Sequence, residues 1–116
     1  MKVELRVLNG NYAGKNVAVR KRTFYFGQSP RYQIQSKSPL MDRCHCALIV
    51  GKTRLLIRDF DSKHGTFVNG ERIKEDRVLD SGDELQVGPL KFEVLIDHGL
   101  GGLKRATASS LSMKRL

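Results

Sequence analysis

Two tight chain reversals are predicted within one short stretch of the chain, residues 59–73. The first ends at Gly65, and glycine is the residue that adopts a positive φ without steric cost. The second is Asn69-Gly70, the dipeptide most typical of a two-residue hairpin turn. Between them, Thr66-Phe67-Val68 has the β-branched and aromatic composition of a strand. We therefore expect the first reversal to project from the edge of a sheet, where binding residues are often found.

The first 96 residues show no helical periodicity. Short alternating or apolar runs are separated by turn residues, which is typical of an all-β sandwich. We expect a two-sheet antiparallel β-sandwich of about 11 short strands. The predicted strands cover residues 3–8, 16–19, 23–26, 46–50, 54–58, 66–68, 77–79, 84–87 and 90–96, with at most a short strand near residues 32–34.

The length and composition indicate one domain and a tail. A chain of 116 residues is long enough for a single core. We assign residues 1–96 to this domain. From residue 97 onward glycine and small residues dominate, so residues 97–116 are predicted to form a flexible basic tail or linker. No apolar run approaches the roughly 20 residues that span a bilayer, and the charged, alternating N-terminus is not that of a signal peptide.

The net charge of the chain indicates which classes of partner it could attract. The chain carries a net charge of +9, of which +3 lies after Ile96, leaving +6 for the predicted domain. Such charge suits an acidic partner (a phosphopeptide, nucleic acid or anionic lipid), although solubility alone explains it equally well.

The cysteines, Cys44 and Cys46, are too close in an extended segment to bond each other. A reducing, cytoplasmic setting is therefore expected.

Three segments carry a recognisable pattern, in matching order and spacing. Residues 59–73 contain Asp-x-x-Ser-x-x-Gly-Thr-Phe-Val-Asn-Gly-x-x-Ile, residues 42–49 read Asp-Arg-Cys-His-Cys-Ala-Leu-Ile, and residues 24–28 read Phe-Tyr-Phe-Gly-Gln. This pattern resembles the forkhead-associated (FHA) domain, whose second segment is Ser-Arg-x-His-x-x-Ile and whose third ends in Gly-Arg. The resemblance covers about residues 3–96. It implies a signalling module, a β-sandwich that binds phosphothreonine peptides.

The resemblance also places four residues at the ligand contacts, and all four depart from the usual types. Gln28 stands where the family has an arginine, and Asp42 where it has a serine; both family residues contact phosphate. Lys63 and His64 stand where the family has Thr-Asn, which contacts phosphate and peptide backbone. Among the charged loop positions only Arg43 keeps the family's residue.

These changes act on phosphate affinity in opposite directions. Gln28 keeps a hydrogen-bond donor but loses a bidentate cation. The Asp42 carboxylate has only acceptors, and at ~4 Å and an effective dielectric of ~20 it repels each unit of like charge by on the order of 4 kcal/mol. Lys63 supplies a compensating ammonium, to which Arg43 and Arg31 add. Either Lys63 and Asp42 pair with each other across the loops, which we favour, or the pocket still binds phosphate.

The remaining residues of the 59–73 stretch receive the following assignments. A neutral His64 ring has one donor and one acceptor, so it could form hydrogen bonds to a peptide backbone. The alternative is that His64 is a loop histidine that faces solvent and has no role in binding. Gly65, Asn69 and Gly70 are assigned as turn formers, and the Asn69 side chain is expected to reach the peptide side of the rim. Thr66 is expected to pack or form a hydrogen bond within its strand.

Two further roles come from the resemblance. Gly27 occupies the glycine of Gly-Arg, and His45 corresponds to the histidine that braces neighbouring loops. The run Cys44-His45-Cys46 also suggests a metal site, but tetrahedral zinc needs four ligands, and strand alternation turns His45 away from both thiols. We therefore expect neither a metal nor another cofactor.

Three functions remain open. An enzyme is not indicated, because no nucleophile pairing or phosphate-cradling glycine loop is recognisable. The first hypothesis is a monomeric protein-interaction module that binds an extended peptide, with a weakened preference for phosphothreonine. The second is an FHA-like scaffold that binds proteins without phosphate. The third is a basic module attracted to nucleic acid or membrane through residues 20–22 and the tail. It predicts binding that weakens with salt and has no sequence preference. Because the first two hypotheses are preferred, we expect no specific nucleic acid and no membrane partner.

Overall fold

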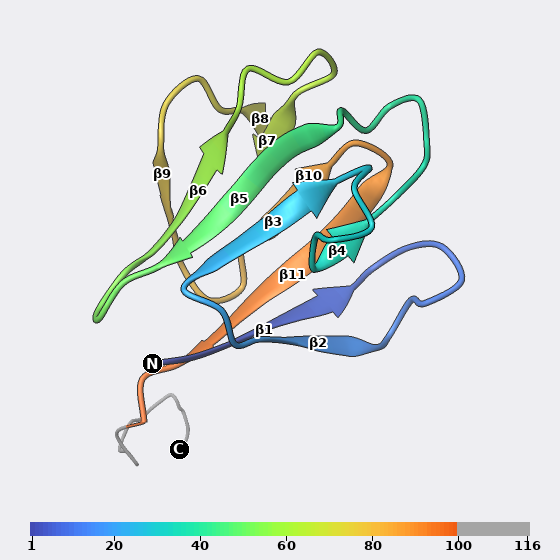
Figure 1. The fold of residues 1–116 in the computed structure, drawn as a ribbon. Coiled ribbons are helices and arrows are strands. Elements are labelled where there is room, and N and C mark those ends of the chain that lie inside the picture. Colours follow the sequence, from blue (N-terminus) through green and yellow to red (C-terminus); the bar gives the residue numbers. More distant parts are fainter. Residues whose placement is uncertain (100–116) are drawn as a thin grey trace.

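The computed structural model describes residues 1–99, so the predicted tail lies outside the described residues from residue 100 onward. Eleven strands form two sheets that pack face to face (Figure 1). The strands are β1 (Lys2–Val7), β2 (Asn16–Val19), β3 (Thr23–Gly27), β4 (Ile34–Gln35), β5 (Cys44–Val50), β6 (Leu55–Asp59), β7 (Thr66–Val68), β8 (Glu71–Arg72), β9 (Arg77–Leu79), β10 (Glu84–Val87) and β11 (Leu90–Asp97).

The topology confirms the predicted two-sheet all-β sandwich. One sheet has the order β2-β1-β11-β10-β7-β8 and the other the order β4-β3-β5-β6-β9. Every pair is antiparallel except β3 with β4. None of residues 1–99 belongs to a helix long and apolar enough to cross a membrane.

Alternating side chains build the core between the sheets. On β1, Val3, Leu5 and Val7 are buried while the residues between them face outward. This is the period of two that a half-buried strand requires. The rings of Phe26 and Phe92, one from each sheet, meet edge to face with centroids 5.8 Å apart at the centre of the core.

Most predicted strands begin and end within one residue of the observed ones, but β4 and β5 each begin two residues away from the predicted start. β4 covers Ile34–Gln35 and pairs in parallel with the end of β3, whereas Tyr32 stacks on Tyr25 with ring centroids 5.2 Å apart. β5 begins at Cys44, two residues before the predicted start, because the pairing between β3 and β5 continues past an irregularity at Gly27. Both differences arise from pairing between segments distant in sequence, which local patterns do not report.

The Asn69-Gly70 hairpin is confirmed. Both residues have positive φ, 51° and 83°, and Val68 pairs with Glu71 across the two-residue turn. Positive φ at both central residues is the geometry of a type I′ turn, whose twist matches that of the strands it joins.

The connections gather at opposite ends of the sandwich (Figure 1). At one end lie three segments that we call the apical loops: the β3–β4 loop (residues 28–33), the β4–β5 loop (residues 36–43) and the β6–β7 loop (residues 60–65). The N-terminus and the β5–β6 hairpin lie at the opposite end.

Candidate functional site in the apical loops

Asp42 joins two of the apical loops. Its carboxylate Oδ2 accepts a hydrogen bond from the backbone N–H of Lys63 at 2.9 Å. The two residues therefore meet across the loops, but through the lysine backbone rather than through the ammonium that the sequence-based hypothesis invoked. Within residues 1–99 neither side chain makes an ion pair. The Asp42 carboxylate is thus held in place while the Lys63 side chain stays exposed to solvent.

Gln28 ties the other pair of loops together. Its backbone N–H donates to the carbonyls of Asp42 and Arg43 at 3.2 and 3.1 Å. Its side-chain Nε2 donates to the carbonyl of Ser38 at 3.3 Å, and the residue is half-buried. The neutral donor that was predicted to face phosphate is therefore used within the protein.

Gly27 permits the close approach of β3 to the β4–β5 loop. A Cβ atom built at this position would lie 2.2 Å from the carbonyl oxygen of Arg43 and 2.9 Å from the ring of Tyr32. Because a backbone oxygen cannot give way as a flexible side chain can, only glycine fits here without moving the loop.

His45 spans two apical loops from inside the sandwich. The side chain is fully buried. Its Nδ1 accepts a hydrogen bond from the N–H of Asp42 at 3.1 Å, and its Nε2 lies 2.8 Å from the carbonyl oxygen of Gly65. Since Nδ1 accepts, Nε2 must carry the proton and donate to Gly65. One ring thus fixes the distance between the β4–β5 and β6–β7 loops.

Asp59 organises the β6–β7 loop. Its Oδ1 accepts from the hydroxyls of Ser62 and Thr66 at 2.6 and 2.7 Å, and its Oδ2 accepts from the N–H of Ser62 at 2.9 Å. Ser62 and Thr66 are both buried. Burial by itself raises the pKa of the Asp59 carboxyl, but the hydrogen bonds from Ser62 and Thr66 outweigh it and hold that pKa below its ordinary value.

This network predicts an acid-sensitive contribution to stability. Because the pKa of Asp59 in the folded state lies below the ordinary value of 3.8, the stabilisation is present above that value and lost as the pH falls through the folded-state pKa. In Asp59→Asn one of the two side-chain acceptors becomes an N–H₂ donor, so either the N–H of Ser62 or the hydroxyl hydrogens of Ser62 and Thr66 lose the oxygen that accepted from them. We expect this change to lower the free energy of unfolding by about 2 kcal/mol at neutral pH, measured by urea denaturation.

The matched control is Asp61→Asn. Asp61 is exposed, has a φ of 57° that asparagine also tolerates, and makes no side-chain hydrogen bond within residues 1–99. Its replacement should change stability by less than about 0.5 kcal/mol. Equal losses in the two variants, or an Asp59→Asn loss that does not shrink below about pH 4, would contradict the assignment.

Arg72 is a site residue that sequence reasoning missed. Its Nη2 donates to the carbonyl of Ser62 at 3.0 Å and lies 3.4 Å from that of Lys63. A Cβ on Gly65 would lie 2.9 Å from the Arg72 Nε, so the side chain runs directly beside this loop. Arg72 pairs with Phe67 across the Asn69-Gly70 hairpin. The hairpin had a sequence signal, but the path of the loop that Arg72 contacts had none.

Asn69 does not join the other candidate residues. Its amide Nδ2 donates to Asp83 at 3.0 Å and its Oδ1 accepts from the N–H of Glu84 at 2.9 Å. The expectation that this side chain reaches the peptide side of the rim is therefore wrong, because both of its polar atoms are committed to the turn between β9 and β10. Gly70 lies beside it in the same hairpin.

The side chains that remain available at the apical loops are mostly basic. Arg31, Arg43, Lys63 and His64 are exposed, and within residues 1–99 their side chains make neither an ion pair nor a hydrogen bond. They belong to the same apical loops as the fixed carboxylate of Asp42. This arrangement can attract an anionic or polar peptide, but it offers a phosphate group no arginine or hydroxyl at the positions of Gln28 and Asp42.

The Cys44-His45-Cys46 run does not converge on a common point. Cys46 lies in the core, where burial raises the pKa of its thiol and keeps it protonated. Both nitrogens of His45 are committed to the loops. Within residues 1–99 no three His, Cys, Asp or Glu residues are grouped to hold a metal ion.

Comparison with known proteins now identifies the fold and its family. The FHA domain family model matches residues 24–88, more than half of the chain. The chain belongs to the FHA domain family. No curated protein matches the sequence significantly.

Solved structures, FHA domains among them, resemble most of this chain. The FHA domain of the CT664 protein from Chlamydia trachomatis is 25% identical, with a TM-score of 0.73 over 84% of this chain and 99% of that one. EmbR of Mycobacterium tuberculosis, in complex with a low-affinity phosphopeptide, is 23% identical, with a TM-score of 0.76 over 87% of this chain and 26% of that one. The N-terminal FHA domain of Saccharomyces cerevisiae Rad53p, bound to a phosphothreonine peptide, is 18% identical, with a TM-score of 0.73 over 84% and 94%.

Proposed function

We propose that this FHA domain is a protein-interaction module whose apical loops bind an extended segment of a partner protein, with phosphothreonine adding little to the affinity. The solved structures of EmbR and Rad53p hold phosphopeptides, which supports a peptide as the class of ligand. The proposal rests on one observation, the Asp42 carboxylate held by the N–H of Lys63 at 2.9 Å.

The charges at the loops support the weak phosphate preference. Asp42 cannot turn away from an incoming dianion without losing the hydrogen bond from Lys63, and like charges at ~4 Å repel by on the order of 4 kcal/mol per unit charge. The exposed cations Arg43 and Lys63 attract the same dianion with Coulomb energies of the same order, and solvent and salt screen the attraction and the repulsion alike at these loops. Phosphate repulsion and attraction therefore nearly cancel, whereas contacts to the peptide itself remain.

The test is a binding titration of the complete chain with two matched oriented peptide libraries, one built around phosphothreonine and one around threonine. We expect the selected peptides to bind both forms with affinities within about threefold, since the net phosphate contribution is near zero. Lys63→Glu combined with Arg43→Glu should abolish the selection of peptides from both libraries. Lys21→Glu combined with Arg22→Glu makes the same change in net charge away from the loops and should preserve it.

Two results would overturn the proposal. The first is a strong preference of the native chain for the phosphorylated library, of about thirtyfold or more, which would require a phosphate contribution of about 2 kcal/mol. The second is that the native chain selects no peptide from either library.

A further inference from the structure

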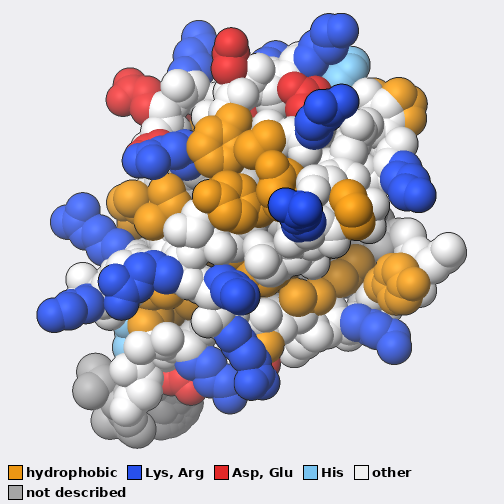
Figure 2. All heavy atoms as spheres, viewed as in Figure 1, with side chains coloured by type: hydrophobic (Ala, Val, Ile, Leu, Met, Phe, Trp, Pro, Cys, Tyr) orange, Lys and Arg blue, Asp and Glu red, His pale blue; other side chains and the backbone are white. Residues whose placement is uncertain are grey.

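A basic groove lies at the end of the sandwich opposite the apical loops. It is open, with a volume of about 960 Å³, and is lined by the start of β1, the corner between β2 and β3, and the turn between β5 and β6. Figure 2 shows Lys and Arg side chains gathered at the end where the N-terminus and the β5–β6 hairpin lie. We call this feature the terminal groove.

The charge of the terminal groove is not neutralised within the described structure. Five of its lining residues are cations: Lys2, Arg20, Lys21, Arg22 and Lys52. None of the five makes an ion pair within residues 1–99, whereas Arg6, Arg58 and Arg77 elsewhere on the surface each pair with a carboxylate. Of the described residues that line the groove, Glu4 alone is acidic. A site with so little internal compensation attracts anions.

The lining also includes an apolar component. Its accessible apolar residues are Met1, Ala18 and Val50, which are half-buried or exposed, and the core residues Val3 and Val19 lie beneath them. The backbone N–H of Val50 donates to the carbonyl of Arg22 at 2.8 Å, so the basic corner is held firmly against β5. Cations beside an apolar lining match a ligand in which carboxylates and apolar side chains are mixed.

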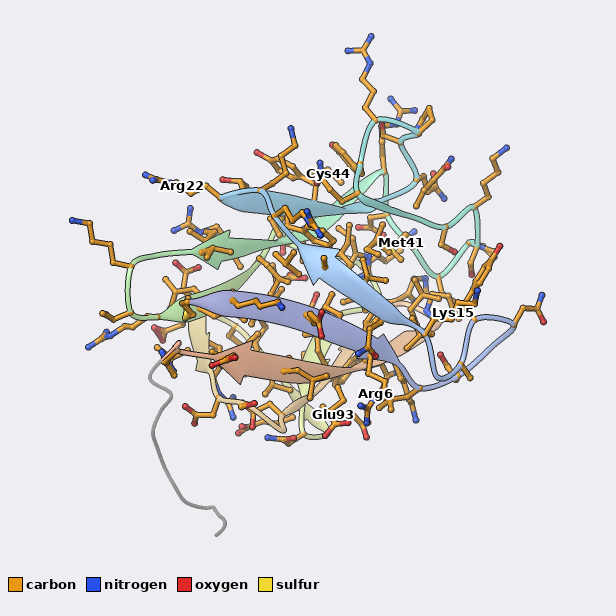
Figure 3. All side chains as sticks on the ribbon, turned by 90° about the horizontal axis from the view of Figure 1, so that it is seen from below. Arg6, Lys15, Arg22, Met41, Cys44 and Glu93 are labelled. Carbon is orange, nitrogen blue, oxygen red and sulfur yellow. The ribbon has the colours of Figure 1, made fainter. Side chains whose placement is uncertain are left out.

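The terminal groove is separate from the apical loops. β3 and β5 pair side by side, and Thr23 and Ile49 lie at the groove end of this pair while Gly27 and Cys44 lie at the apical end. Figure 3 shows Arg22 at one end of the sandwich and Met41, from the β4–β5 loop, toward the other. A ligand could therefore occupy the groove while a peptide occupies the apical loops.

The chemistry of the lining selects among possible anions. Among residues 1–99 the groove lining holds no aromatic side chain, so this part of the chain offers no platform on which nucleic acid bases could stack. A hollow surface does not match a flat bilayer. A second copy of this chain would bring another strongly positive surface, since residues 1–96 carry a net charge of +6. We propose that the terminal groove binds an acidic segment of a partner protein that combines Asp or Glu with apolar residues, independently of the apical loops.

The experiment measures fluorescence anisotropy with the complete chain and four labelled probes. The first is a peptide of about twelve residues that alternates Glu with Val and Leu. The others are the same peptide with Lys in place of Glu, a single-stranded RNA of similar length, and phosphatidylserine vesicles. We expect binding of the acidic peptide, with an affinity that falls as salt rises from about 50 to about 300 mM because the attraction is electrostatic.

Variants locate the binding. Lys21→Glu combined with Arg22→Glu should weaken acidic-peptide binding about tenfold or more. Lys74→Glu combined with Lys91→Glu makes the same change in net charge at exposed residues outside both the groove and the apical loops, and should leave the binding unchanged. If the first variant unfolds below the native melting temperature, Lys21→Gln combined with Arg22→Gln serves instead, with a smaller loss expected. A further variant replaces Lys104, Arg105, Lys114 and Arg115 by Gln and should retain binding.

Several outcomes would overturn the inference. Tighter binding of RNA or vesicles than of the acidic peptide would assign the basic end to a different class of partner. Equal losses from the groove variant and from the Lys74–Lys91 control would indicate attraction by net charge alone. Loss of binding only in the tail variant would place the site beyond the groove. The function proposed for the apical loops would stand in each case, because its test uses different ligands and the Lys63–Arg43 variant.

Discussion

Replacing Asp42 with serine and Gln28 with arginine should turn this domain into one that strongly prefers phosphorylated peptides. In the native chain the ratio of affinities for phosphothreonine and threonine peptides is expected to be near one. The double variant removes the fixed carboxylate and adds a guanidinium that can grip phosphate with two parallel hydrogen bonds. A charge-assisted pair of this kind contributes about 1.5–3 kcal/mol, which corresponds to a gain of about 10- to 100-fold in that ratio.

The structure indicates that both replacements fit. In Asp42→Ser the shorter side chain gives up the 2.9 Å hydrogen bond from the N–H of Lys63, but this N–H belongs to an exposed residue that water can satisfy, and the His45 ring still joins the two loops. Gln28→Arg would lose the 3.3 Å hydrogen bond to Ser38, but the backbone hydrogen bonds from residue 28 to the β4–β5 loop do not depend on its side chain. The loops should therefore keep their arrangement.

The measurement is a titration of matched phosphorylated and unphosphorylated peptides against native and variant chains. The control is Asp80→Ser combined with Gln86→Arg, which changes the net charge equally. Asp80 lies in the turn between β9 and β10, and Gln86 lies on β10; neither side chain makes a hydrogen bond within residues 1–99. A double variant without any gain in phosphate preference, or an equal gain in the control, would contradict the role given to Asp42 and Gln28.

Replacing His45 with alanine should destabilise the domain more than any change at an exposed loop position. The ring is fully buried, and its loss leaves the N–H of Asp42 and the carbonyl of Gly65 without their partner. A cavity and two unsatisfied polar groups together should cost about 3–5 kcal/mol in the free energy of unfolding. Urea denaturation followed by circular dichroism would measure this loss.

His64→Ala is the matched control, because His64 is exposed in the adjacent loop and its side chain makes no hydrogen bond within residues 1–99. We expect it to change stability by less than about 0.5 kcal/mol. If His45→Ala does not fold, His45→Gln should fold with a smaller loss, since an amide can both donate and accept. A loss of under about 1 kcal/mol in His45→Ala would show that the two loops hold their arrangement without the ring.

The sequence alone determined the parts of this protein that depend on neighbouring residues. Alternation predicted β1 and the core face of Val3, Leu5 and Val7, because the period of a strand is a local property. Asn69-Gly70 predicted its hairpin because a positive φ at two successive residues restricts the turn to one type. Together with the family pattern, these features were sufficient for the all-β sandwich.

Only the tertiary structure decided which side chains meet in the apical loops. Asp42 and Lys63 are 21 residues apart, and whether the carboxylate contacts an ammonium or a backbone N–H depends on how two separate loops are held together. For the same reason Asn69 turned toward Asp83 instead of the rim. The contact of Arg72 with Ser62 also had no local signal. Turns follow from the φ and ψ preferences of adjacent residues, whereas contacts between loops follow from the packing of the strands that carry them.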